Sequence, residues 1–565
     1  MNSEAKIAYF SMEVGLSHDI PTYSGGLGVL AGDTIKSGAD LKIPLVAVTL
    51  LSKKGYFRQD IDNDGRQIEY PVFWEPSKFM VLQPKRVKIQ IEGRDVYVQA
   101  WRYKVTSITG GEVDVYYLDT DIEDNTQEDR DITATLYGGD DRYRLKQEIV
   151  LGIGGVRILR ALGVHIKKYH MNEGHASLLT LELLLVHKRD VESVWDERWV
   201  WDTDTVRDLC VFTTHTPIEA GHDRFSYDLI KKVLGEFVPL ELLKSLCGQQ
   251  YLNMTLLALN LSKYVNGVAK KHGEVSKILF PGYEINAITN GVHSFTWTCE
   301  YFKRLYDKYI PSWANEPELF VRAENIPDEE VWNAHLSAKN DLLDYIRNST
   351  RLKLGENVLT IGFARRFTSY KRADLLFSNL DRLSKISEKG MFQIIFAGKA
   401  HPRDILGKDI IKKIYDLAKI ISGKVNVVFL KDYNMAMALK LISGVDVWLN
   451  TPLRPREASG TSGMKAAHNG VINFSILDGW WIEGHIEGIT GWSIGPKPLE
   501  SSLSITNDAV DADDLYHKLE NIIIPMYYQD RTEWIKIMRN SISKIAYYFN
   551  SHRMMRRYVT EAYIR

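Results

Sequence analysis

The stretch that decides the fold is VLTIGFARRFTSYKRADLLFSNLDRLSKISEKGMFQIIFAG, residues 358–398. Two short apolar runs, 358–365 and 392–398, flank residues 372–387, whose apolar positions recur with the spacing of a helix. This order predicts a strand, a helix and a second strand. Because the helix carries the chain back across the sheet, the two strands of such a unit lie parallel.

The same alternation continues toward the C-terminus. Residues 425–430 and 447–450 predict two further strands, and NMAMALKLISGVD (434–446) predicts the helix between them. Strands that alternate with helices predict a doubly wound parallel sheet with helices on both faces. Ligands of such folds bind at the carboxyl ends of the strands.

The first half of the chain shows this pattern with an insertion. Its predicted elements are strands at 6–13, 45–52, 167–173 and 209–215, a helix at 148–163, and antiparallel strands at 87–93, 96–105 and 113–119. The strand pattern lapses between about 295 and 355. We therefore expect an α/β fold of two Rossmann-like domains, 1–295 and 296–540, that face one another across a cleft. A long C-terminal helix, 541–565, is expected to cross back to the first domain.

Composition excludes several classes of protein. The 565 residues include 71 basic and 72 acidic side chains, so no overall positive field attracts nucleic acid or an anionic membrane. Cys210, Cys247 and Cys299 form no CxxC pair, which argues against a disulfide framework and a structural zinc site. No apolar run approaches membrane-spanning length and no signal peptide is recognisable, so we expect a cytoplasmic protein.

Two glycine-containing segments could face a ligand. Tyr23–Asp33, YSGGLGVLAGD, places three glycines ahead of a predicted helix, where backbone N–H groups can approach an anion. A tight strand-to-helix turn would also explain these glycines. His175 in NEGH and Asn290 in TNGVH lie at similar junctions, but a core histidine and a turn asparagine are equally ordinary interpretations.

A cluster of cations follows the strand at 358–365. Arg365, Arg366, Lys371 and Arg372 lie within eight residues. In isolation such a run indicates a solvated helix face. At the carboxyl end of a parallel strand, however, guanidinium and ammonium groups would point into the cleft, where they suit phosphate oxygens.

The third candidate is Lys465 in EASGTSGMKAAHNG, residues 457–470. Lysine is rarely buried, and here its neighbours are mainly small residues. A desolvated amine has a lowered pKa and can attack an aldehyde to form a Schiff base. The alternative is a lysine at the start of a helix that extends to water.

Together these segments resemble the α-glucan phosphorylases of glycogen, starch and maltodextrin, the pyridoxal-phosphate branch of the GT-B glycosyltransferases. The matching segments run in order along the chain: YFSMEVGL, SGGLGVLAGD, RLKQE, NEGH, TTHTP, VNGVAKKHGEVS, TNGVH, GFARRFTSYKR and EASGTSGMK. The last is the most specific, because the related nucleotide-sugar glucan synthases share the glycine loop but are not expected to have the lysine.

The resemblance implies a role for each candidate. Lys465 would carry pyridoxal 5′-phosphate as a Schiff base, and the phosphate of the cofactor, not its carbonyl chemistry, would act as general acid and base. Arg366, Lys371 and the backbone N–H of Gly26 would hold the substrate phosphate. Arg365 stands where the family has a lysine that contacts the cofactor phosphate, a change that keeps the charge.

The remaining matches concern the cofactor pocket and the sugar. Tyr433, Thr461 and Ser462 would line the cofactor phosphate; Ser462 replaces a glycine of the animal enzymes, and Asn434 an arginine. The residues that match sugar-binding positions are Gly26, Leu27, His175, Asn290, Glu457, Ser459 and Gly460. The backbone carbonyl of His175 would stabilise the oxocarbenium-like transition state.

The implied reaction is phosphorolysis of the terminal α-1,4-linked glucose of a glucan, which gives α-D-glucose 1-phosphate with retention and requires no metal. The partners would be a glucan or maltodextrin and inorganic phosphate, and a homodimer is the family expectation. We expect no regulatory N-terminal extension and no phosphorylation switch there. Two alternatives are a nucleotide-sugar α-glucan synthase and a non-catalytic glucan-binding protein of the same fold.

Overall fold

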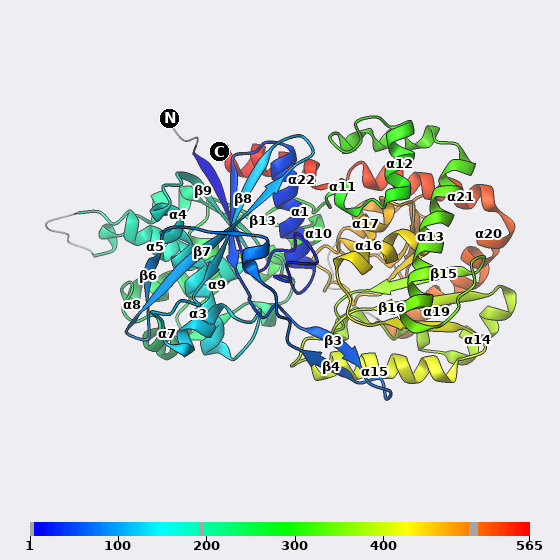
Figure 1. Ribbon diagram of the computed structural model, residues 1–565, viewed down its shortest axis with the longest axis horizontal. Coiled ribbons are helices and arrows are strands. Elements are labelled where there is room, and N and C mark those ends of the chain that lie inside the picture. Colours follow the sequence, from blue (N-terminus) through cyan, green and yellow to red (C-terminus); the bar gives the residue numbers. More distant parts are fainter. Residues whose placement is uncertain (1–4, 191–196, 497–506, 565) are drawn as a thin grey trace.

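Two sheets organise the computed structural model, which describes residues 5–190, 197–496 and 507–564. The first has the strand order β14-β13-β10-β9-β1-β2-β8-β7-β5, with β6 also paired to β7, and the second has the order β17-β16-β15-β18-β19-β20. Figure 1 shows the first sheet on the left, covered by α1 (Gly26–Asp40) and α4 (Gly155–Ala161), and the second on the right, between α13 (Asp328–Thr350) and α15 (Ile405–Ile420). The N-terminal residues 1–4 lie outside the described residues, so the expected lack of a phosphorylation switch there stays a prediction.

The second sheet is parallel throughout, as predicted. Its strands are β15 (Leu359–Ala364), β16 (Phe392–Ala397), β17 (Asn426–Leu430), β18 (Val447–Asn450), β19 (Ile472–Ile476) and β20 (Gly491–Ile494). All residues of β15 and β16 are buried, which explains why both read as continuous apolar runs. The strand order reverses between β15 and β18. Such a switch point opens a crevice at the carboxyl ends of the two strands.

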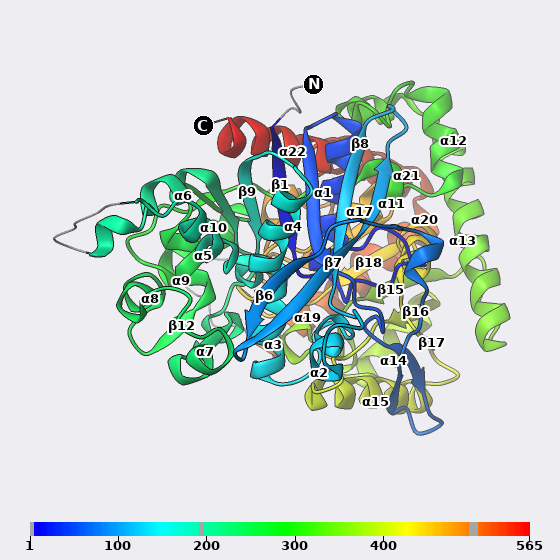
Figure 2. The same ribbon diagram turned by 60° about the vertical axis from the view of Figure 1, so that its left-hand side comes forward.

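The first sheet is mixed. Its parallel strands are β1 (Lys6–Ser11), β2 (Leu45–Leu50), β8 (Glu112–Asp119), β9 (Ile166–Asn172), β10 (Cys210–Thr213), β13 (Tyr264–Gly267) and β14 (Asn286–Ala287). The antiparallel insertion comprises β5 (Val81–Leu82), β6 (Val87–Ile91) and β7 (Arg94–Thr106) beside β8. The prediction that 113–119 is an antiparallel strand is right on one side only, because β8 pairs parallel with β2. Figure 2 shows β1, β7 and β8 running beside α1.

A hairpin absent from the prediction connects the two sheets. Strands β3 (Arg58–Ile61) and β4 (Gln67–Tyr70) form an antiparallel pair that lies beside α15 (Ile405–Ile420) in Figure 1. The Gln59 side chain donates to the Gly398 carbonyl oxygen at 2.8 Å. Lys431 in turn donates to Asp60. The hairpin therefore belongs to the first half of the chain but forms hydrogen bonds with the second.

Two predicted helix boundaries are wrong. The helix predicted from 372 begins only at Leu380 (α14, Leu380–Lys389), because Arg372 adopts a left-handed conformation and its guanidinium pairs with buried Asp511. Helix α1 (Gly26–Asp40) begins earlier than predicted, so only Gly25 of the three glycines precedes it. The helix of residues 148–163 forms, as α3 (Asp141–Ile149), a π-helical turn and α4 (Gly155–Ala161).

The C-terminal segment runs from the second sheet to the first. Helices α21 (Arg531–Asn540) and α22 (Ser551–Tyr558) are separated by a break near 547–550, so the predicted long helix is interrupted. Helix α22 packs against α1, red beside blue in Figure 1. The division of the chain at 295 and 540 stays a prediction. No helix among the described residues combines the length and the apolar character needed to cross a bilayer.

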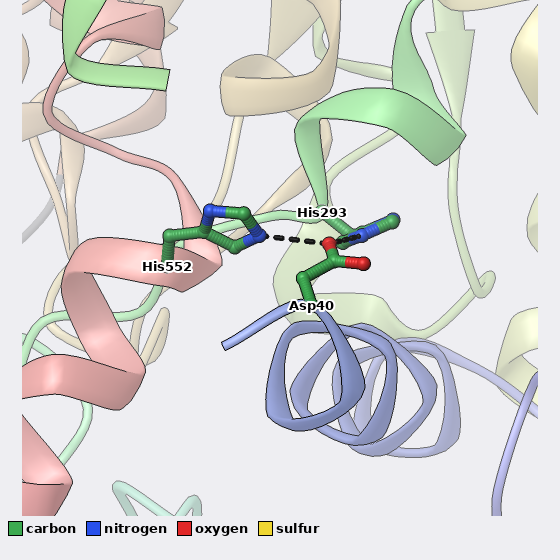
Figure 3. Close-up of side chains that lie close together, drawn as sticks. All are labelled: Asp40, His293 and His552. Carbon is green, nitrogen blue, oxygen red and sulfur yellow. Dashed lines mark hydrogen bonds and ion pairs between the residues drawn. The ribbon is translucent and has the colours of Figure 1, made fainter. Parts of the chain in front are cut away.

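A buried cluster ties α22 to α1. Nε2 of His293 and Nε2 of His552 lie 2.6 and 2.8 Å from Oδ2 of Asp40, as Figure 3 shows. Within the described residues this is the one group spaced to hold a metal ion. However, Nδ1 of His293 accepts from the Thr296 N–H, so its Nε2 carries the proton and donates to Asp40. Hydrogen bonds therefore explain the cluster without a metal, and we call it the Asp40 latch.

Candidate active site

One cavity of about 650 Å³ lies between the carboxyl ends of the two sheets. Its walls come from the segments that follow β1, β9, β15 and β18 and from the first turn of α1. Every site residue that the resemblance implied lines it: Gly26, Leu27, His175, Asn290, Arg365, Arg366, Lys371, Tyr433, Glu457, Ser459, Gly460, Thr461, Ser462 and Lys465. The prediction that Arg372 also points into the cleft is wrong, because its guanidinium pairs with Asp508 and Asp511. The structure thus brings together residues up to several hundred positions apart.

The glycine side of the cavity is organised by Glu13, a residue that the sequence analysis missed. Its carboxylate accepts hydrogen bonds from the backbone N–H groups of Ser24 (2.5 Å) and Gly25 (3.3 Å) and from the Tyr137 hydroxyl (3.0 Å). A Cβ atom on Gly28 would lie 2.7 Å from the same carboxylate, so glycine is required there. A Cβ on Gly26 would meet no atom within 4 Å, because this residue faces the open cavity.

The cation side is a group of three basic residues with one acid. Glu457 accepts from Lys371 at 2.5 Å and from Arg365 at 2.8 Å. Burial alone would raise the pKa of Glu457, but the charges of Lys371 and Arg365 lower it to about 2. The solvated-face interpretation of this run is therefore wrong for Lys371, which is buried.

Arg366, unlike Lys371 and Arg365, forms no ion pair with an acidic side chain among the described residues. It donates a hydrogen bond to none of the residues that the structure describes, and its side chain is exposed toward the cavity. Two nitrogen atoms of Arg365, Nε and Nη1, are buried and also lack an acceptor within the described part of the chain. The cavity wall therefore offers N–H donors and positive charge to an anion.

Asp478 fixes the backbone at Glu457. The Asp478 carboxylate accepts from the backbone N–H of Glu457 and from that of Gly479, each at 2.9 Å. Burial raises the pKa of Asp478 to about 7, and the nearby charge of Glu457 adds to this rise. No sequence pattern indicated Asp478, because it follows β19 rather than lying within the 457–470 segment.

Lys465 lies on α17 (Ser462–Ala467), a helix that begins three residues earlier than predicted. The residue is only 8% exposed, which rules out the alternative of a lysine extended into bulk water. Its Nζ atom lies 3.9 Å from the ring centroid of Trp297. Burial lowers the pKa of Lys465 to about 8, opposed by Asp33 and assisted by Lys36. A minority of the amine, roughly a fifth, is therefore neutral near physiological pH.

The pocket around Lys465 also contains the predicted cofactor residues. The Ser462 hydroxyl accepts from the Trp448 indole at 3.0 Å, and burial raises the pKa of Tyr433. Asn434, which replaces an arginine of the animal enzymes, has a local role, because its side chain accepts from the Met437 N–H and caps α16 (Met435–Gly444).

His175 and Asn290 form the opposite wall. Nε2 of His175 lies 3.4 Å from Asp223, and burial together with the charge of Arg144 lowers the His175 pKa to about 3, so the ring is neutral. Oδ1 of Asn290 is buried and has no hydrogen-bond partner among the described residues. Arg553 of α22 donates to the backbone carbonyl oxygens of Thr289 (2.6 Å) and Asn290 (2.9 Å) and fixes this loop.

The chain is similar to known proteins over almost its whole length. Residues 236–487 match the family model for carbohydrate phosphorylases. The maltodextrin phosphorylase of Thermococcus litoralis is 42% identical over 99% of this chain and 70% of its own length. The glycogen phosphorylases of Aquifex aeolicus and Mycobacterium tuberculosis are 38% and 36% identical over 99% of this chain, and 86% and 70% of their own lengths.

Proposed function

The chain belongs to the carbohydrate phosphorylase family, and we propose that it transfers the terminal α-1,4-linked glucose of a glucan to inorganic phosphate, releasing α-D-glucose 1-phosphate. One observation carries this proposal for the site. The buried amine of Lys465 and the cations Arg365, Arg366 and Lys371 line the same cavity. An amine with a lowered pKa suits an aldehyde cofactor, and the cations suit phosphate.

The residues present fit pyridoxal 5′-phosphate. The Lys465 amine has no hydrogen-bond or ion-pair partner among the described residues, and Arg365 keeps two buried N–H groups without an acceptor. Lys465 would hold the aldehyde end, and Arg365, Tyr433, Thr461 and Ser462 the phosphate end. When bound, the cofactor supplies a phosphate group whose second pKa, near 6, suits it to proton exchange.

Arg366, Lys371 and the N–H of Gly26 would bind the substrate phosphate. Their charge is needed because two unit charges of like sign about 5 Å apart repel by roughly 3 kcal/mol at an effective dielectric of 20. Arg366 forms no ion pair with the described residues, so it is available to the phosphate. Lys371 shares its charge with Glu457, so it contributes to the substrate phosphate only in part.

The sugar would lie between Glu457, Ser459 and Gly460 on one side and Asn290 and Leu27 on the other. Glu457, ionised at neutral pH, accepts hydrogen bonds from hydroxyl groups, and the free Oδ1 of Asn290 does the same. His175 is neutral, so its backbone carbonyl and not a cationic ring would face the developing positive charge.

We further propose the GT-B arrangement, with Rossmann-like domains 1–295 and 296–540 and segment 541–565 returning to the first. The cavity at the switch point between β15 and β18 supports it. The proposal includes a cytoplasmic location and a homodimer. It includes no nucleic-acid or membrane partner, in keeping with the net charge of −1.

The direct test is a product assay. Purified protein is incubated with maltodextrin and phosphate, and α-D-glucose 1-phosphate is measured with an anomer-specific coupled enzyme. We expect phosphate-dependent product that Lys465→Ala abolishes. Glucan elongation from ADP- or UDP-glucose without phosphorolysis would instead indicate a synthase, and glucan binding without turnover would indicate a binding protein.

A further inference from the structure

Lys465 rests on an aromatic ring that is itself fixed in orientation. Trp297, the last residue of α11 (Ser294–Trp297), is 1% exposed, and its ring centroid lies 3.9 Å from Nζ of Lys465. Its indole N–H points at both carboxylate oxygens of Asp33 on α1, each 2.9 Å away. Nζ of Lys465 lies over the ring, so the face of the indole, to which a cation is attracted, is turned toward the amine.

The side chain of Asn469 forms hydrogen bonds with the backbone of both Trp297 and Lys465. Nδ2 of the fully buried Asn469 donates to the Trp297 carbonyl oxygen at 2.7 Å and to the Lys465 carbonyl oxygen at 3.1 Å. Its Oδ1 accepts from the Cys299 N–H at 2.8 Å. The ring and the lysine therefore keep a constant offset although they come from distant parts of the chain.

Two charged groups of opposite sign act on this amine, and both lie on α1. Asp33 favours the ammonium form of Lys465, and Lys36 disfavours it. Lys36 is held in place through its hydrogen bond to Thr296 Oγ1, at 3.1 Å, next to Trp297. Burial has the largest effect on the pKa of Lys465 and lowers it. The charges of Asp33 and Lys36 then shift this lowered pKa by smaller amounts in opposite directions.

We propose that Asp33, Trp297 and Asn469 are positioning residues that hold the Lys465 amine at the cavity wall, ready to condense with an aldehyde. In that step the neutral amine adds to the aldehyde carbon and one water leaves, so that a C=N bond replaces the C=O bond. The choice of aldehyde rests on the proposed function, but the positioning does not. The indole face holds the protonated form of Lys465 in place, and burial keeps a neutral, nucleophilic fraction in equilibrium with it.

The first test measures the amine without the cofactor. The full-length protein is freed of bound aldehyde with hydroxylamine, and Lys465 acetylation by acetic anhydride is followed by mass spectrometry from pH 6 to 11. We expect Asp33→Asn to lower the pKa of Lys465 and Lys36→Met to raise it, each changing the neutral fraction at pH 7.5 by roughly threefold in opposite directions. Equal profiles, or shifts in the same direction, overturn the proposal.

The second test measures condensation. Pyridoxal 5′-phosphate is added to the same protein, and the near-ultraviolet band is followed in time. We expect Trp297→Leu to slow incorporation by about tenfold and Trp297→Phe to restore much of the rate, because a benzene ring keeps part of the cation attraction. Wild-type rates in Trp297→Leu contradict the proposal.

A matched control is available. Trp313 is equally buried and donates to Asp307 as Trp297 does to Asp33, but it is not part of the cavity lining. Trp313→Leu should leave both readouts of Lys465 unchanged. Asp33→Asn and Lys36→Met could shift the pKa of Lys465 in opposite directions while the wild-type protein never incorporates the cofactor. In that case the positioning stands and the proposed function fails.

Discussion

Lys371 and Glu457 are joined by an ion pair of 2.5 Å that bridges the ends of two neighbouring strands, since Lys371 follows β15 and Glu457 follows β18. Arg365 donates to the same carboxylate oxygen. One acid is thus shared by two cations, and Arg366 beside them is unshared within the described residues. The wall keeps a net positive charge, which is what two phosphate groups in one cavity require.

Arg366→Ala should therefore weaken phosphate binding. Loss of a charge-assisted hydrogen bond costs about 1.5–3 kcal/mol, so we expect the phosphate KM to rise by roughly tenfold to a hundredfold and kcat to fall. Steady-state kinetics with maltodextrin in excess measure both constants. Arg366→Lys keeps the positive charge but loses the planar guanidinium group, so its phosphate KM and kcat should lie between those of the wild type and of Arg366→Ala. Unchanged kinetics in both variants would count against the assigned role.

The pH dependence of stability tests the Glu457 ion pairs. The folded pKa of Glu457, about 2, lies below its unfolded value of roughly 4.3, so the carboxylate stabilises the fold above pH 5 and this stabilisation is lost as the pH falls toward 2. Compared with Glu457→Gln, the wild type should be more stable by about 3 kcal/mol at neutral pH. Urea unfolding at pH 3 to 7 measures the difference, and a gap that stays constant over this range contradicts the assignment.

Alanine substitutions at two glycines of α1 should affect different properties, ligand binding for Gly26 and stability for Gly32. Gly26→Ala adds a methyl group to the open cavity, so we expect unchanged thermal stability and impaired phosphate and sugar binding. At Gly32 a Cβ would lie 1.9 Å from the Gly15 carbonyl oxygen, so Gly32→Ala should cost about 3 kcal/mol of unfolding free energy. Thermal melts and kinetics on both variants separate the effects; a destabilised but fully active Gly26→Ala would refute the placement.

The Asp40 latch should stabilise the C-terminal segment. The hydrogen bonds from His293 and His552 outweigh the effect of burial and hold the pKa of Asp40 well below its usual range. In Asp40→Asn both histidines lose a charged acceptor, and an NH2 group replaces the oxygen that accepts from Ser107, so we expect a loss of about 3 kcal/mol. In Asp40→Asn, hydrogen exchange should be faster in α22 than in the other helices. Chelators should leave the melting temperature unchanged, whereas a clear rise with added zinc would reveal a metal site.

The sequence predicts the second sheet well because its interior strands are buried on both faces and read as apolar runs. Arg366 followed from the strand that it comes after, since the carboxyl ends of parallel strands define the crevice, whereas Glu457 was identified only through the family resemblance. Glu13, Asp478 and Trp297 could not be found this way, because each acts through a neighbour that is distant in the chain. Their positions carry no local signature.

Local signals also misplaced some boundaries. The periodicity of residues 372–387 fits a helix, but the buried ion pair between Arg372 and Asp511 holds the chain in turns until Leu380. The latch joins Asp40 to His552 across 512 residues, a separation over which no sequence pattern operates. Tertiary contacts of this kind decide the details that periodicity leaves open.

The most direct measurement is borohydride trapping followed by peptide mapping. The purified protein, reduced with sodium borohydride, should lose its near-ultraviolet band and yield one peptide that carries the reduced pyridoxyl phosphate on Lys465. Lys465→Ala should show neither band nor label. A wild-type protein active in phosphorolysis whose label lies on another lysine, or that carries no label at all, would contradict the central role given to this amine.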